Sequence, residues 1–322
     1  MLDLKLIRSK PELIAENCRK RNVNVDIEKL LKLDEKVRQT TTEVDSFRQS
    51  RNDISNKMKG NLSAEERQPL IEESKQLRDQ EAEKESVLRE LTEQRLELLK
   101  QVPNLTHPDS PEGLTDEDNQ PIRKMGTIPE FDFEPKDHVE LMEALDLIDF
   151  DGGAKVSGQK FYFLKNQAVF LELALANYAL DLLQKEGFTV HMTPDLARHQ
   201  ILDGIGFNPR GEETQIYSVE DFDLCLIATA EITLGGLLVD QVLDPERLPI
   251  MYAGFSHCYR TEAGAAGRES RGLFRVHQFS KVEMFAFTHP DQSEGMHQKM
   301  LALEEQIYQD LGIPYLVVNI CS

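Results

Sequence analysis

The sequence predicts an α+β protein, in which a long antiparallel helical hairpin, a coiled-coil arm, precedes an antiparallel β-sheet flanked by helices. Three observations support this class. A seven-residue apolar repeat runs through the first hundred residues, a proline-rich stretch follows it, and short apolar runs of strand length then alternate with helix-like segments. Because 322 residues exceed what one core usually holds, we expect two domains joined by a linker.

Two heptad-patterned segments predict the N-terminal hairpin. Between residues 27 and 58, apolar residues form two rows with a period of seven, which is typical of a coiled-coil seam. One row holds Leu30, Val37 and Val44, and the other holds Leu33, Phe47 and Ile54. The rows of the second segment include Leu70, Leu77, Leu91 and Leu98.

A turn separates the two segments. Gly60-Asn61 has turn chemistry, and Ser63 with Glu66 fits a capping box at a new helix start. Pro103 ends the second helix, so about 35 residues at 1.5 Å each make an arm of roughly 50 Å. We therefore expect residues 1–102 to fold back as an antiparallel hairpin.

A composition change marks the domain boundary. Residues 103–135 contain six prolines with Gly, Asp and Asn among them, which predicts a linker. Residues 136–322 then form the second domain. Helical patterns cover 170–186, which stops at Gly187, and 292–311. The strand-like runs are FTVHM, LCLIAT, MYAGFSHCYR, LFRVHQFSKVEMFAF and YLVVNI.

The charge is distributed unevenly along a chain whose net charge is −20. An acidic protein is a poor partner for nucleic acid, because phosphate contacts need Lys and Arg. Residues 1–102, however, carry 21 basic and 21 acidic residues, while the rest of the chain carries 16 and 36. The N-terminal third is therefore the part that we expect to face a polyanion.

The sequence gives no sign of membrane insertion or export. No stretch approaches the ~20 apolar residues of a membrane span, and charge interrupts every apolar run at the N-terminus. Four cysteines lie far apart without a C-x-x-C pair, so we expect reduced thiols in a cytoplasmic protein.

The segment 255–287 carries the clearest chemistry, as two predicted strands around a loop of small and basic residues. Arg260 and Glu262 are two apart, so both should leave one face of a strand. A guanidinium there can hold a phosphate oxygen, and a carboxylate can accept from an amine. Arg271 and Arg275 lie beyond the loop.

Further polar residues follow the same logic. On the returning strand, Phe279 can stack on a base, and Glu283 faces the same side four residues on. In the strand-like LCLIATAEITLGG, Thr229 and Glu231 offer a hydroxyl and a carboxylate that can together grip an ammonium group.

Each pattern, taken alone, also has a structural explanation. The heptad hairpin is more often a dimerising element than an arm for RNA. Arg260 with Glu262 can be a cross-strand ion pair that contributes little to stability, and Phe279 can be a core residue. Thr229-Ala230-Glu231 can be an ordinary strand edge.

Taken together, these segments resemble the seryl-tRNA synthetases, a family of class II aminoacyl-tRNA synthetases. Arg-x-Glu, the Gly/Arg loop and RGLFRVHQFSKVE resemble motif 2, and Thr229-Ala230-Glu231 resembles the serine-binding T-x-E. Residues 170–186 with Pro194 resemble motif 1. The opening MLDLKLIRSKPE and the segment GGAKVSGQKFYFLKNQA are also similar, so the resemblance covers essentially the whole chain.

The resemblance implies an ATP site and a serine pocket. It places Arg260 on the α-phosphate and Glu262 at the adenine end, as catalytic positions, with Phe279 as the stacking ring. The other implied ATP-binding positions are Thr261, Arg271, Val276, His277 and Gln278. The implied serine-binding positions are Thr229, Ala230, Glu231 and Glu283.

The resemblance also implies an activity, that of a serine–tRNA ligase. ATP and Mg²⁺ would activate L-serine to seryl-adenylate, and a homodimer would pass the seryl group to tRNA(Ser) held by the helical arm. Charging of tRNA(Sec) stays open. A complete family member continues past Ser322 into a metal-binding acidic residue, further serine contacts and motif 3, so no Mg²⁺ ligand is assigned.

Two other functions stay open at this stage. One is a catalytically incomplete tRNA-binding fragment or paralogue, which would keep the arm but make no adenylate. The other is a structural coiled-coil protein with a decayed core, which would bind neither tRNA nor serine.

Overall fold

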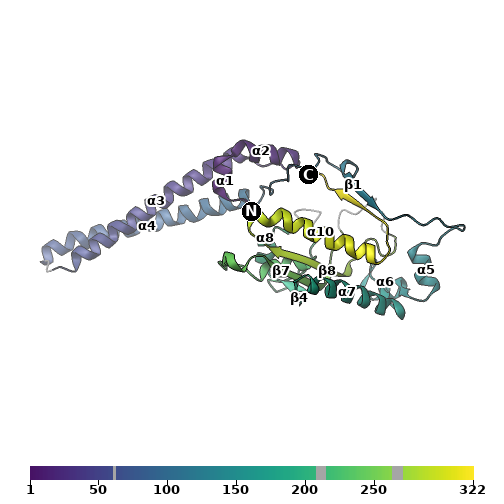
Figure 1. The fold of residues 1–322 in the computed structure, drawn as a ribbon. Helices are drawn as coiled ribbons and strands as arrows, with labels where there is room; N and C mark the ends of the chain where they lie inside the picture. Colours follow the sequence, from purple (N-terminus) through teal and green to yellow (C-terminus); the bar gives the residue numbers. More distant parts are fainter. Residues whose placement is uncertain (61–62, 208–214, 263–270) are drawn as a thin grey trace. The chain divides into compact units, whose positions relative to one another are not determined.

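The chain folds into two compact units. The computed structural model describes residues 1–60, 63–207, 215–262 and 271–322. Unit 1 comprises Met1–Arg123 with Val317–Ser322, and unit 2 comprises Lys124–Leu316. The predicted α+β class is confirmed, because a long helical hairpin is followed by β-strands and further helices (Figure 1).

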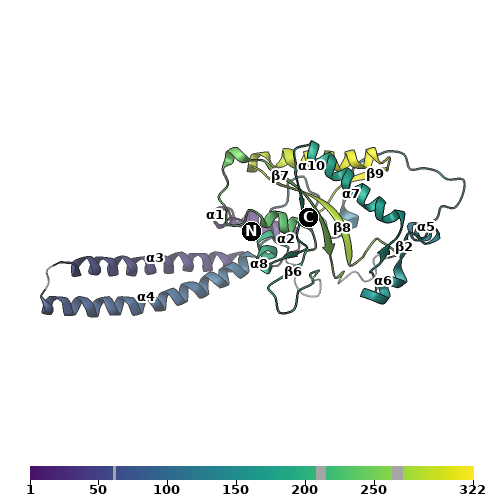
Figure 2. The same cartoon turned by 90° about the horizontal axis from the view of Figure 1, so that it is seen from below.

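Two long helices dominate unit 1, namely α3 (Ile27–Met58) and α4 (Ala64–Leu99). They run side by side as an antiparallel hairpin (Figure 2), which confirms the predicted arm. The predicted seam residues of α4 are half-buried. In α3 the seam is more fully covered, with buried Leu30, Leu33, Val37, Val44 and Ile54 and half-buried Phe47.

The start of α4 has the predicted capping box. The Ser63 N–H donates to the Glu66 carboxylate at 2.9 Å, and the Glu66 N–H donates to the Ser63 hydroxyl at 3.3 Å. Two free amides at the helix start are thereby satisfied. Asn61 of the predicted turn lies outside the described residues.

A buried carboxylate joins three helices at the base of the arm. Asp34 on α3 is 1% exposed. It accepts from Arg95 on α4 at 2.8 Å and from Arg8 on α1 (Leu4–Ser9) at 2.9 Å. Two guanidinium partners offset the cost of burying the charge.

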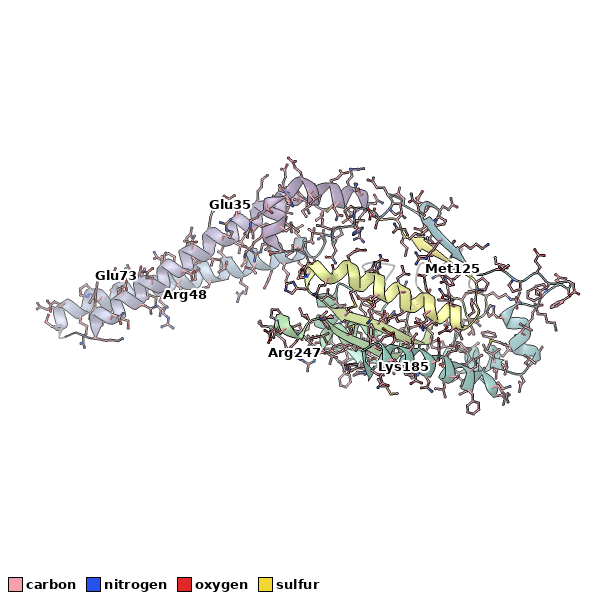
Figure 3. All side chains as sticks on the ribbon, in the orientation of Figure 1. Glu35, Arg48, Glu73, Met125, Lys185 and Arg247 are labelled. Atoms are coloured by element: carbon pink, nitrogen blue, oxygen red, sulfur yellow. The ribbon has the colours of Figure 1, made fainter. Side chains whose placement is uncertain are left out.

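A second charged group lies further along the arm. Glu81 on α4 is 8% exposed and pairs with Arg48 and Arg51 of α3. Figure 3 shows Arg48 on α3, with Glu35 on α3 and Glu73 on α4 among the many charged side chains that project from the arm. The two helices are thus held by ion pairs as well as by the apolar seam.

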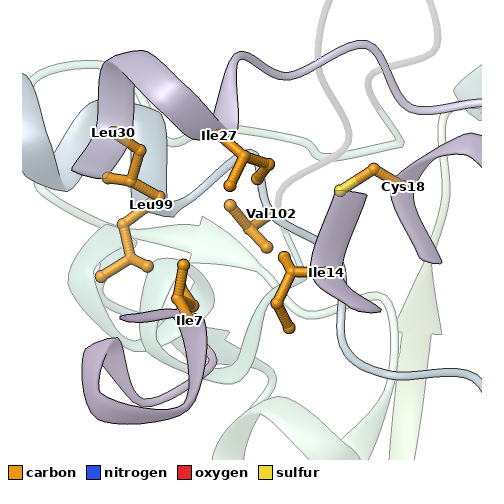
Figure 4. Close-up of a cluster of buried hydrophobic side chains, with 7 residues drawn as sticks. All are labelled: Ile7, Ile14, Cys18, Ile27, Leu30, Leu99 and Val102. Carbon is orange, nitrogen blue, oxygen red and sulfur yellow. The ribbon is translucent and has the colours of Figure 1, made fainter. Parts of the chain in front are cut away.

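A small apolar core closes the base of the arm. The short helices α1 and α2 (Pro11–Lys20) contribute to it together with the near ends of α3 and α4. Figure 4 shows its members, Ile7, Ile14, Cys18, Ile27, Leu30, Leu99 and Val102.

Two strands form a small separate sheet. β1 (Gln120–Met125) pairs with β9 (Tyr315–Asn319). β9 confirms the strand predicted from YLVVNI. β1 and the short helix η1 (Asp116–Asp118) lie within the stretch 103–135 that its prolines predict to be a linker.

The central sheet of unit 2 has the strand order β4-β7-β8. The strands β7 (Ile250–Tyr259) and β8 (Gln278–Phe287) are antiparallel, as predicted. β4 (Thr189–Met192) runs parallel to β7, so this sheet is mixed and not wholly antiparallel.

Two long helices cover one face of this sheet, and both confirm predicted segments. They are α7 (Gln167–Lys185), followed by Gly187 at a φ of 91°, and α10 (Ser293–Asp310). An apolar cluster fixes them there, with Leu183, Phe188, Ala253, Leu303, Val282 and Met284 among its members.

Short elements complete unit 2. Before the central sheet lie α5 (His138–Ala144), β2 (Ile148–Asp149), α6 (Phe150–Ser157) and β3 (Phe163–Leu164). The others are β5 (Leu196–Ala197), α8 (His199–Ile205), β6 (Cys225–Leu226), α9 (Ala230–Gly236), η3 (Pro245–Arg247) and η4 (Pro290–Gln292). Among the described residues, no helix is both long enough and apolar enough to cross a membrane.

One predicted strand is wrong. The run LCLIATAEITLGG was expected to be extended, but only Cys225–Leu226 forms a strand and α9 begins directly after Thr229. Thr229 is the N-cap, and its hydroxyl accepts from the Glu231 N–H at 3.3 Å. This local cap outweighs the β-propensity of the apolar residues around it.

Candidate active site

The predicted site residues of β8 share one face of the strand. Phe279 and Glu283 are four residues apart, with Lys281 between them, and side chains alternate along a strand. Val282 and Met284 point to the other face, where they pack in the apolar cluster under α7 and α10. The site face is therefore the one that these two helices leave uncovered.

Helix α9 packs on the site face at a glycine. A Cβ on Gly254 of β7 would lie 3.2 Å from the Ala230 Cβ and 2.9 Å from the Leu234 Cδ1. Gly254 pairs with Glu283 across the hairpin. The missing side chain lets the first turn of α9 approach the strand closely, beside Glu283.

Arg260 and Phe279 are brought together at one end of the hairpin. The Arg260 Cζ lies 5.2 Å from the centroid of the Phe279 ring, within the range of a cation–π interaction. The backbone N–H of Arg260 donates to the His277 carbonyl at 3.0 Å, and its Nε donates to the Ala228 carbonyl at 3.4 Å. A guanidinium and an aromatic ring thus lie side by side.

The expected placement of Glu262 beside Arg260 on one strand face is wrong. β7 ends at Tyr259, and Glu262 has a φ of 52°, so the chain has already turned. The Glu262 carboxylate instead accepts from the Arg275 Nη1 at 3.1 Å, with its side chain 8% exposed. Its N–H donates to the Gln215 Oε1 at 3.0 Å.

The other implied ATP positions have varied surroundings. Arg271 is exposed and pairs with Asp137, the N-cap of α5, at 2.9 Å. Val276 is buried. The Thr261 N–H donates to the Gln215 carbonyl at 3.2 Å. Gln278 lines a cavity of about 160 Å³ that also contacts Phe279.

The implied serine-binding residues meet in one polar cluster. The Thr229 hydroxyl donates to the Glu283 carboxylate at 2.6 Å, and Thr229 is 3% exposed. The Lys281 ammonium donates to the same hydroxyl at 2.7 Å and also pairs with Glu283. Ala230 and Glu231 follow in the first turn of α9.

The electrostatics of this cluster favour a bound cation. Burial raises the pKa of Glu231, the Glu283 carboxylate raises it further, and Lys281 opposes the rise. Two carboxylates beside one ammonium leave a surplus of negative charge. A ligand ammonium group would therefore be favoured near Glu231 and Glu283.

The sequence did not indicate that Lys281 belongs to the site, or that Arg275 and Gln215 are the partners of Glu262. Strand alternation could have found Lys281, because it lies midway between two predicted site residues. The partner of Glu262 depends on a turn with positive φ, and Gln215 lies far away in sequence. Across the described ranges, no three His, Cys, Asp or Glu side chains gather as a metal site.

Family models match both ends of the chain. Residues 1–106 match the seryl-tRNA synthetase N-terminal domain. Residues 217–322 match the tRNA synthetase class II core domain of the G, H, P, S and T types. The first match covers the helical arm, and the second covers the site face of the β7–β8 hairpin.

Curated relatives match over the full chain. A serine–tRNA ligase of Treponema denticola is 49% identical over 322 residues, which are all of this chain and 76% of that protein. A serine–tRNA ligase of Rubrobacter xylanophilus is 52% identical with the same coverage.

Solved structures agree with these matches. Seryl-tRNA synthetase from Pyrococcus horikoshii, complexed with ATP, gives a TM-score of 0.87 at 38% identity and covers 100% of this chain and 77% of its own. Cytoplasmic serine–tRNA ligase from Naegleria fowleri, in complex with AMP, gives 0.82 at 30% identity, with 99% and 75% covered. The chain belongs to the seryl-tRNA synthetase family.

Proposed function

We propose that this chain is a serine–tRNA ligase that activates L-serine with ATP on the site face of the β7–β8 hairpin and transfers it to tRNA. One observation carries the proposal. The same face joins a guanidinium–aromatic pair, Arg260 with Phe279, to a polar cluster that contains Thr229 and Glu283. A nucleotide, whose phosphates need a cation, and an amino acid, whose ammonium group needs carboxylates, can thus bind side by side.

The nucleotide end uses Arg260 and Phe279. Phe279 offers an aromatic surface for adenine, and Arg260 offers a guanidinium for the α-phosphate. As the serine carboxylate attacks the phosphorus and pyrophosphate leaves, negative charge grows on the phosphate oxygens, and a fixed guanidinium stabilises it. The Pyrococcus relative was solved in complex with ATP, which supports ATP as the nucleotide of this chain.

The amino-acid end uses Thr229, Glu231 and Glu283. The two carboxylates receive the serine ammonium, and the buried Thr229 hydroxyl orients the carboxylate of Glu283. No protein nucleophile is required, because the serine carboxylate itself attacks. A pocket built to bond a hydroxyl rejects analogues that lack it by large factors.

Magnesium is proposed to enter as part of the nucleotide substrate. The Mg²⁺ implied by the family resemblance would offset part of the negative charge of the ATP phosphates when bound. The described residues present no group of acidic side chains suited to hold it. No step is therefore assigned to a protein-bound metal.

The helical arm is proposed to hold serine tRNA. α3 and α4 form an exposed hairpin with many charged side chains. The net charge of residues 1–102 is 0, while the remaining residues carry the whole charge of −20. Because phosphate contacts need cations, the arm is the better suited part of the chain.

A homodimer is proposed to form through α7. This helix exposes Phe170 at 71%, Leu171 at 60% and Leu173 at 48%. Neighbouring exposed apolar side chains on a helix are typical of a protein interface. Light scattering of the purified chain tests this, since a Phe170→Glu variant should halve the mass if the proposal is right.

A cytoplasmic location is proposed from the thiols. Cys18, Cys225, Cys258 and Cys321 are all free, and the first three are buried. Free cysteines are typical of a reducing compartment.

The decisive experiment is serine-dependent ATP–pyrophosphate exchange, with threonine and alanine as competing substrates. We expect exchange with serine and a loss of about a hundredfold or more in an Arg260→Ala variant, because one fixed donor to the developing charge is removed. Arg247→Ala, which removes an exposed arginine of η3, is the matched control.

The outcomes separate the candidate functions. Exchange that is independent of serine, or unchanged by Arg260→Ala, would contradict the proposal. No exchange with intact tRNA binding would favour the binding fragment or paralogue, which identity over the whole chain disfavours.

A further inference from the structure

We propose that Lys281 is a positioning residue of the serine pocket, which holds Thr229 and Glu283 in the geometry that receives the substrate ammonium and balances the paired carboxylates. The inference rests on the proposed function and deepens it.

The geometry places Lys281 at the centre of the cluster. It lies on β8 two residues from Glu283 and shares its face. Its Nζ is 2.7 Å from the Thr229 Oγ1, and it also pairs with the Glu283 carboxylate. Since Thr229 bonds Glu283 at 2.6 Å, the three side chains form a closed triangle in which each group is held by two others.

The triangle connects two elements that are far apart in sequence. Thr229 caps α9, whereas Lys281 and Glu283 belong to β8. Its bonds therefore fix the N-terminus of α9, with Glu231 in its first turn, against the strand. The side chain of Lys281 is 28% exposed, so it is partly withdrawn from solvent where it joins the two elements.

The charges around the triangle explain why a cation is needed there. Glu231 and Glu283 repel each other, and Glu283 also raises the pKa of Glu304 beyond the effect of its burial, while His297 opposes that rise. Lys281 acts on Glu231 in the opposite direction to Glu283. Among the described residues, the titratable groups whose charges act on this cluster on its own side of the sheet include Glu231 on α9, Cys258 and Arg260 at the end of β7, and Glu283 on β8, while Glu304 and His297 act from α10, which packs on the other face.

Loss of Lys281 should therefore have a specific signature. In Lys281→Met, the triangle loses a charged hydrogen bond, so the KM for serine should rise roughly tenfold to a hundredfold. The KM for ATP should change little, because Arg260 and Phe279 are untouched. A role limited to folding would lower the amount of active enzyme and leave the KM for serine unchanged.

The pH profile provides a second signature. The pKa of Glu231 is already raised, and Lys281 keeps it from rising further. Without Lys281, Glu231 stays protonated to a higher pH, so the acid limb of serine kcat/KM should move to higher pH. Lys281→Arg keeps the charge and should keep this limb, even if its longer group raises the KM for serine.

The test measures exchange kinetics across acidic to neutral pH for the full chain and for Lys281→Met and Lys281→Arg. Lys299→Met is the matched control, because Lys299 on α10 also pairs with a glutamate, Glu186, outside the cluster. Circular dichroism checks the fold of each variant.

Each result of this test either supports or overturns the positioning role of Lys281. A raised serine KM and a shifted limb in Lys281→Met, with the limb retained in Lys281→Arg, supports the inference. A normal serine KM and limb in Lys281→Met overturns it while the proposed function stands. If Lys281→Met does not fold, the folded Lys281→Arg variant decides. An acid limb of serine kcat/KM shifted in this variant overturns the inference, and a retained acid limb supports it. No serine-dependent exchange by the unsubstituted chain overturns the proposed function, and the inference falls with it.

Discussion

At the scale of single residues, the Thr229 hydroxyl uses its whole bonding capacity. It accepts from the Lys281 ammonium and the Glu231 N–H, and it donates to the Glu283 carboxylate. A hydroxyl has one proton and two lone pairs, so no further bond is available. A substrate that contacts this oxygen must exchange one bond for another.

Removal of this hydroxyl should be severe although the volume is kept. Thr229→Val loses the N-cap and both charged contacts, so serine-dependent exchange should fall about a hundredfold. Thr229→Ser keeps the oxygen and should retain most activity. Thr233→Val is the control, because the Thr233 hydroxyl donates to the Ala230 carbonyl of its own helix. Equal exchange rates in the Thr229→Val enzyme and this control would refute the prediction.

At the scale of elements, the site depends on how closely α9 approaches the sheet. Gly254→Ala should push the first turn of α9 away, since the new Cβ would lie 2.9 Å from Leu234 and 3.2 Å from Ala230. We expect a KM for serine raised several-fold to tenfold, with the KM for ATP nearly unchanged. Gly295→Ala on α10 is the control, because a Cβ added there would meet no atom of the other described residues within 4 Å beyond its own helix backbone. An effect on ATP equal to that on serine would argue against the prediction.

The stability of the helical arm should depend on the buried carboxylate of Asp34. Asp34→Ala removes the carboxylate that α1, α3 and α4 share, so the free energy of unfolding of unit 1 should fall by about 2 to 3 kcal/mol. Urea unfolding followed by the helical circular dichroism signal measures it. Asp53→Ala, at an exposed position of the same helix, should change little. Identical unfolding curves for the two variants would count against the prediction.

At the scale of the whole molecule, tRNA binding and adenylate formation should separate. Lys36 and Lys75 are exposed on α3 and α4. Changing both to Glu should weaken tRNA binding and flatten its dependence on salt, because fewer counterions are released. ATP–pyrophosphate exchange should stay normal. Filter binding at several salt concentrations checks this, and a fall in exchange that matches the fall in tRNA affinity would contradict it.

Much of the fold could be predicted because its signals are local. The heptads of α3, the Ser63–Glu66 cap and the β7–β8 hairpin each arise from residues close in sequence. The start of α9 could not be predicted, because an apolar run of strand character surrounds its cap. For the site, Phe279 and Glu283 follow from strand alternation, but the contact of Lys281 with Thr229 spans 52 residues and needs the packed fold.

The charged pairs of the arm have a consequence for length. A leucine seam with a period of seven looks the same after a slip of one heptad, so apolar packing alone would tolerate a hairpin about 10.5 Å out of step. The bonds from Asp34 to Arg95 and from Arg51 to Glu81 do not repeat, and a slip would break both at once. The ion pairs therefore permit one register of α3 against α4, and this register fixes the length of the arm.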